Sequence, residues 1–180
     1  MAAPQFIVNM NTALAFTEML NRVGVWVGGT LLLGVSIMIG IEVILRKVFS
    51  ISMGGADEIS SYVLAISCSW AFGFGLLRKA HIRIDILYSR LPATARSILD
   101  ILSLITFIAY LMPLIYFAFV VVNTSVLRES TANTPLQTPL WIPQGIWLAG
   151  LVVFLLTCVV LLTGTIQRLA AGDIGGARQL

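Results

Sequence analysis

Residues 140–166 read LWIPQGIWLAGLVVFLLTCVVLLTGTI, a run of 27 residues that contains no charged side chain. At a rise of about 1.5 Å per residue, a helix of this length spans about 40 Å, which exceeds the roughly 30 Å of a bilayer's hydrocarbon core. The apolar residues are continuous and do not alternate with polar ones, which favours a helix over a barrel strand. This run therefore predicts a transmembrane helix.

Three further charge-free runs have the length of a membrane span: Val23–Ile41, Ile59–Leu77 and Ile101–Leu127. The whole chain is 58% hydrophobic and only 11% charged, and a soluble domain of 180 residues cannot hide so much apolar surface. We predict an all-α integral membrane protein with one domain over residues 1–180. Its four transmembrane helices are expected at about 23–45, 59–78, 100–127 and 141–167.

The basic residues divide unevenly between the two sides of this arrangement. One side holds the two termini and the central loop and carries eight cations, whereas the other carries three, Arg46, Lys47 and Arg128. The positive-inside rule places the richer side, with both termini, in the cytoplasm, so residues 79–99 are predicted to form a basic cytoplasmic loop. For residues 1–22 the sequence leaves open whether they form a short interfacial helix, because their apolar residues do not lie on one face of a helix.

Catalysis, metal binding or ion transport within the membrane would need ionisable side chains near the middle of the predicted spans. No acid, base or histidine stands near the centre of any span, and His81 is the single histidine of the chain. One histidine cannot supply both axial ligands of a haem or a histidine metal cage. Since His81 falls in the predicted central loop, a Ser-His-Asp triad within a span is likewise unsupported. Cys68 and Cys158 lie in apolar stretches and are interpreted as packing residues. We expect no enzyme activity, no catalytic, metal or substrate site, no cofactor and, without a dense basic tract, no nucleic-acid partner.

Acidic and basic residues gather at the outer border of the first two helices. Glu42 and Arg46 form an i,i+4 pair, and Asp57 and Glu58 open the second helix, where the helix dipole favours negative charge. We predict that Arg46 is shared between Glu42 and Glu58 as a clasp between helix ends. The alternative is that this border, with the loop at 50–55, contacts an external protein partner.

Small residues recur at four-residue spacing in the second helix, as Ala65, Ser69 and Gly73, and in the first, as Gly24 and Gly28. Such spacing lets membrane helices approach closely. The seam serves packing within this chain, a partner subunit, or both. Pro113 falls within the third span and frees the carbonyl of Ala109, which predicts a kink.

At the inner border the sequence continues with charged residues, Arg78, Lys79, His81, Arg83 and Asp85. Cations so close to a bilayer suit anionic phospholipid headgroups. The same pattern is also what a simple topology signal requires.

These elements together resemble a known family. The patterns Glu42-x3-Arg46-x2-Phe49, Arg78-x2-His81-Ile82-x2-Asp85 and Leu91-Pro92-x3-Arg96, with Glu58, Trp70, Gly73 and the segment 136–144, are similar to the small membrane subunit of tripartite ATP-independent periplasmic (TRAP) transporters, the Q-type subunit of dicarboxylate-type systems. The likeness covers about residues 20–165. The family's usual outer loop carries proline and tryptophan, where this chain has Met53-Gly54-Gly55-Ala56.

The resemblance implies a multi-pass subunit of the bacterial inner membrane without a substrate or sodium site of its own. It implies two protein partners, a large permease subunit that carries an organic anion inward with sodium and a periplasmic substrate-binding protein that delivers the anion. The small subunit would enlarge the stationary scaffold of the symporter. Two alternatives remain, a small dimeric multidrug-type transporter using Glu42 or Glu58, and a membrane anchor of a redox enzyme using Arg78 or His81.

Overall fold

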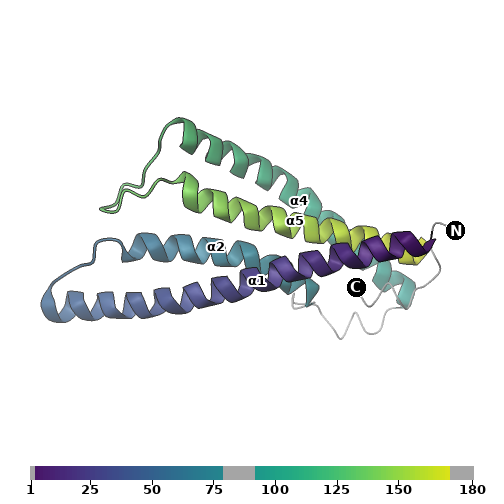
Figure 1. The fold of residues 1–180 in the computed structure, drawn as a ribbon, viewed down its shortest axis with the longest axis horizontal. Helices are drawn as coiled ribbons and strands as arrows, with labels where there is room; N and C mark the ends of the chain where they lie inside the picture. The colour runs from purple at the N-terminus through teal and green to yellow at the C-terminus, as the bar shows by residue number, and fades with distance from the viewer. Residues whose placement is uncertain (1–2, 79–91, 171–180) are drawn as a thin grey trace.

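The computed structural model describes residues 3–78 and 92–170, and four long helices account for most of them (Figure 1). They are α1 (Ala3–Ile44), α2 (Ala56–Leu77), α4 (Ala93–Leu127) and α5 (Trp141–Ala170), with a short π-helical turn, η1 (Leu45–Phe49), after α1. All four are long and apolar enough to cross a membrane. The described ranges hold no β-strand, only an isolated bridge between Thr131 and Pro139. The predicted all-helical fold with four spans is confirmed.

Two helices begin earlier than the charge-free runs. The first helix is continuous from Ala3, so residues 3–22 are its first turns and not a separate helix. The helix α4 begins at Ala93, directly after Pro92, and not at residue 100. The charged residues Arg22 and Asp100 end the apolar runs, but a single charged side chain does not end a helix, and both helices continue through these positions.

The chain forms two helical hairpins that lie side by side. The helix α1 packs along α2 and α5 packs along α4, while α2 and α5 join the two hairpins (Figure 1). The connections at 45–55 and 128–140 lie at one end of the molecule, called the loop end below. The opposite end, where α1 starts and α5 finishes, is called the terminal end.

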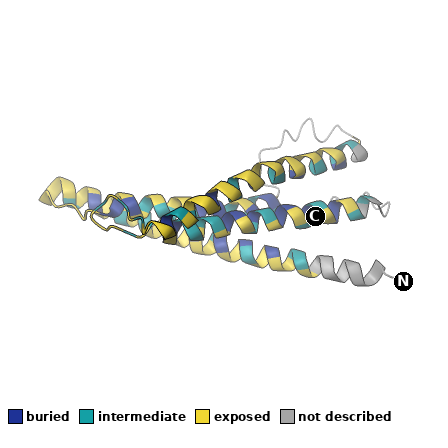
Figure 2. Ribbon diagram, turned by 90° about the horizontal axis from the view of Figure 1, so that it is seen from above, coloured by how far each residue is buried: buried dark blue, intermediate teal, exposed yellow. Residues whose placement is uncertain are grey.

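The shared interior is a narrow apolar core with its centre on α5. Leu151, Phe154 and Cys158 of α5 are buried among leucines of the other helices, and the Phe154 ring lies 5.7 Å from the rings of both Phe72 and Phe107. Exposed residues cover the outward faces of the helices (Figure 2), and most of the large ones are apolar. Apolar outward faces are what a bilayer-embedded bundle requires.

Candidate functional site

The contact between α1 and α2 is close because α1 offers two glycines. A Cβ added at Gly24 would lie 2.7 Å from Cε3 of Trp70, and one at Gly28 would lie 3.1 Å from Oγ of Ser67. That hydroxyl donates a hydrogen bond to the Gly28 carbonyl at 3.1 Å. The Trp70 indole N–H donates to the carbonyl of Ile146 at 3.0 Å and thereby joins α2 to α5.

The predicted small-residue seam lies partly inside the chain. Ser69 and Gly73 are buried, Ser69 against Gly150 of α5 and Gly73 against Asn21 of α1. Ala65 is exposed on the surface of α2 and is not brought together with the other two. Within the described residues, then, two of the three positions serve the packing of the chain's own helices.

A polar junction joins α1, α2 and α5 near Gly73. Asn21, only 1% exposed, donates through Nδ2 to the Thr17 carbonyl at 2.8 Å and to Oγ1 of Thr157 at 2.9 Å. Its Oδ1 has no hydrogen-bond partner among the described residues and lies against Gly73. Asn21 is not among the residues that the sequence patterns predict. The available signal was the Thr17–Asn21 pair, two polar residues four apart that share one helix face.

At the loop end, Glu42 fastens the connection between α1 and α2. This side chain is only 4% exposed, and its carboxylate accepts three hydrogen bonds at 2.8 Å. The donors are the Arg46 guanidinium, the Ser52 hydroxyl and the backbone N–H of Met53. A carboxylate at the end of α1 thus fixes the course of the loop that leads into α2.

Glu58 performs the same task between α2 and the loop that connects α4 with α5. It is 6% exposed and accepts from the hydroxyls of Tyr62, at 3.0 Å, and of Thr134. Glu58 therefore joins segments that lie far apart in the sequence.

The predicted sharing of Arg46 between two carboxylates is wrong. Its guanidinium pairs with Glu42, whereas Glu58 accepts from the hydroxyls of Tyr62 and Thr134 instead. The physical reason is the position of the second loop, which places a threonine donor beside Glu58 where the sequence offered only Arg46. Asp57 and Glu58 do stand in the first turn of α2, as expected, and Asp57 is exposed.

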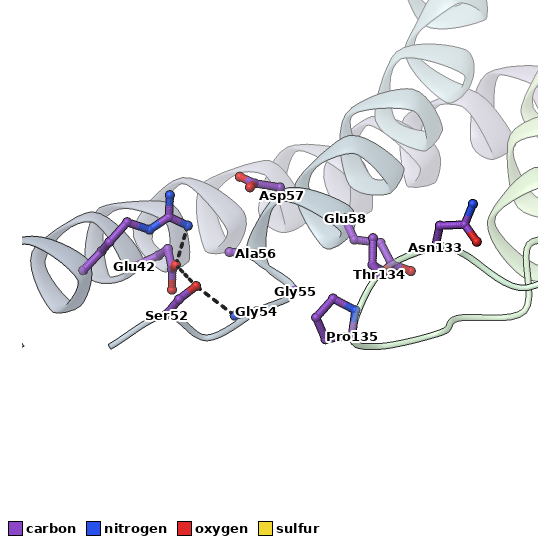
Figure 3. A pocket seen from close by; sticks show the side chains of 11 residues that line it. Glu42, Ser52, Gly54, Gly55, Ala56, Asp57, Glu58, Asn133, Thr134 and Pro135 are labelled. Atoms are coloured by element: carbon purple, nitrogen blue, oxygen red, sulfur yellow. Dashed lines mark hydrogen bonds and ion pairs between the residues drawn. The ribbon is translucent and has the colours of Figure 1, made fainter. Parts of the chain in front are cut away.

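A polar pocket of about 220 Å³ separates the two loops (Figure 3). Figure 3 shows Glu42 and Ser52 on one side and Thr134 and Pro135 on the other, with the start of α2 between them. The pocket is lined by Glu42, Arg46, Ser52, Gly54, Gly55, Ala56, Asp57, Glu58, Asn133, Thr134 and Pro135. Since the two buried carboxylates are engaged in internal bonds, the pocket is a preformed surface feature that both loops hold in shape.

Of the residues predicted at the inner border, Arg78 is the one that lies within the described residues, and it stands at the terminal end. Arg78 lies 3.7 Å from Glu18 of α1 and 5.3 Å from the centre of the Phe74 ring. Both charged side chains are more than half exposed, so this ion pair contributes at most about 1 kcal/mol. The predicted lipid-contact residues Lys79, His81, Arg83 and Asp85 lie outside the described residues.

A comparison with protein-family models gives one result for this chain. Residues 35–168 match the family described as tripartite ATP-independent periplasmic transporters, DctQ component. This match spans more than two thirds of the chain and includes the last ten residues of α1, all of α2 and α4, and α5 except for its last two residues. Searches of curated proteins and of solved structures gave no significant match.

Proposed function

The chain belongs to the DctQ component family of tripartite ATP-independent periplasmic transporters, and on that premise we propose that it is the stationary scaffold of such a transporter. It is a small multi-pass subunit of a transporter and not an enzyme by family. In the proposal it joins a large permease subunit in the bacterial inner membrane. The large subunit carries an organic anion together with sodium, after a periplasmic binding protein has delivered it.

The observation that carries the proposal is where the buried carboxylates lie and what they do. Glu42 and Glu58 are the buried charged residues of the described chain, and both stand at the loop end. Each accepts several internal hydrogen bonds, which supports a structural task for both carboxylates. The buried polar residues deeper in the bundle, Asn21, Ser67, Ser69 and Thr157, are uncharged. This distribution supports a role in assembly over one in conduction.

The proposed orientation places both termini in the cytoplasm and the loop end in the periplasm. Its support is the eight-to-three division of basic residues described above. The loop end would then face the binding protein, and the bonds of Glu42 and Glu58 would present a fixed surface to it. A fixed surface lowers the ordering cost of docking.

The multidrug-type alternative is not favoured. Coupled efflux requires a titratable carboxylate that a substrate or proton can reach within the membrane, whereas Glu42 and Glu58 stand at the loop end and are held by their own donors. No contact in the described residues supports the redox-anchor alternative, since Arg78 is engaged with Glu18 and Phe74.

The proposal is tested by co-expression with a large permease subunit of this transporter family. We expect a complex with one copy of each chain to survive purification in mild detergent and to have the combined mass by native mass spectrometry. Recovery of this chain only as a free monomer, while the large subunit by itself is fully active, would reject the scaffold role.

A further inference from the structure

The helix α4 has one face with no partner in the described structure. Its buried face repeats every seven residues, through Leu104, Leu111, Ala118 and Ser125, and packs on α5. The opposite face is exposed along the length of the helix (Figure 2). Among its exposed residues are two tyrosines, Tyr110 at 67% and Tyr116 at 64%.

Both tyrosines lie near the middle of the span. The charge-free run from Ile101 to Leu127 has its centre at Leu114, so Tyr110 and Tyr116 stand about 6 Å and 3 Å from that centre along the helix axis. Phe107, whose ring lies against Phe154 halfway along α5, stands about 10 Å from Leu114 along the axis of α4, and Tyr110 lies between these two levels. Tyrosines of a membrane protein usually stand at the interface, where the hydroxyl reaches water, and a side chain at this depth is too short to do so.

A third polar group stands between them. Pro113 is exposed and lies between the two tyrosines on the helical wheel. Because proline has no backbone N–H, the carbonyl of Ala109, also exposed, lacks its usual donor. Neither tyrosine hydroxyl has a hydrogen-bond partner among the described residues, so three polar groups face outward at mid-span. Lipid tails cannot satisfy any of them, and each unsatisfied group in hydrocarbon costs several kcal/mol.

We infer that this face of α4, around Tyr110, Pro113 and Tyr116, is the surface that a transmembrane helix of the large permease subunit covers. The covering helix carries side chains that donate and accept hydrogen bonds at mid-span, such as serine, threonine, asparagine or glutamine. The inference rests on the proposed function for the identity of the partner. It adds to that function the helix, the depth and the chemistry of the contact.

A photo-crosslinking experiment tests the occupant of this face. Benzoylphenylalanine replaces Tyr110 or Tyr116 in turn, in membranes that contain the co-expressed large subunit, and the chain is irradiated. We expect adducts with the large subunit from both positions. If wild-type chain co-purifies with the large subunit but both positions label only lipid, or a second copy of this chain, the inference is overturned and the proposed function stands. If wild-type chain does not co-purify, the proposed function itself fails.

A second arm measures the hydroxyls directly. Tyr110→Phe and Tyr116→Phe remove only an oxygen from exposed side chains and leave the fold intact. An interhelical hydrogen bond in a membrane is typically worth a factor of about three in affinity, so we expect about three-fold weaker association for each variant and about eight-fold for both. The matched control is Tyr62→Phe, whose hydroxyl bonds to Glu58 inside the chain, with affinity for the large subunit unchanged. Wild-type affinity in the double variant would contradict the inference.

Discussion

A methyl group added at Gly73 tests the polar junction of the bundle. The new Cβ would overlap the Asn21 amide and lie 2.8 Å from its Cγ, so the amide must move and release its bonds to Thr17 and Thr157. Overpacking of this kind costs about 1–3 kcal/mol, and the lost interhelical bond to Thr157 about 0.6 kcal/mol. Alanine returns up to about 1 kcal/mol through its better helix propensity. We expect Gly73→Ala to lower the free energy of unfolding by about 2 kcal/mol.

The assay is unfolding by sodium dodecyl sulfate in mixed micelles, followed by tryptophan fluorescence. Gly29→Ala is the matched control, because nothing lies within 4 Å of a Cβ at that position, and it should leave stability unchanged or slightly raised. In an Asn21→Ala background, where the amide is gone, Gly73→Ala should cost nothing. A full 2 kcal/mol loss in that background would refute the assignment of the cost to Asn21.

Three further predictions concern the hydrogen bonds that join one helix to another helix or to a loop. Glu42→Gln removes the charge that holds Arg46 and the Met53 N–H; it should lower stability and speed hydrogen exchange at the Met53 amide, whereas Asp57→Asn at the exposed neighbouring site should do neither. Thr134→Val takes a donor from Glu58, and we expect faster exchange and proteolysis in residues 130–139 with the helices unaffected; equal protection in both proteins would count against this hydrogen bond. Trp70→Phe keeps a ring against Gly24 but loses the bond to the Ile146 carbonyl, which should lower stability by about 1 kcal/mol in the same micelle assay, and an unchanged midpoint would show that this bond is dispensable.

The helices were predictable because their signal is local. Burying a charge in hydrocarbon is costly, so runs such as Leu140–Ile166 mark the spans directly. The ends of the helices were less predictable, since Arg22 and Arg96 leave the hydrocarbon without leaving the helix. Composition therefore identified all four spans and missed the first turns of α1 and α4.

The hydrogen bonds that join the helices and loops connect residues distant in the sequence, so no local pattern predicts them. Glu58 and Thr134 are 76 positions apart, and Asn21 and Thr157 are 136 apart. Sequence analysis found Glu42, Arg46 and Glu58 as a border cluster but assigned Arg46 to both carboxylates, because the threonines of the second loop had no visible link to α2. It could likewise place Ser69 and Gly73 on a close-packing face without knowing that Asn21 and Gly150 fill the other side.

Uptake by proteoliposomes tests the scaffold role most directly. Vesicles are prepared with this chain alone, with the large permease subunit alone and with both, and each set is given a sodium gradient, the binding protein and its labelled organic anion. We predict accumulation only where the two membrane subunits occur together, and none with this chain alone. Sodium-dependent accumulation of the anion by vesicles that hold this chain and no large subunit would contradict the account.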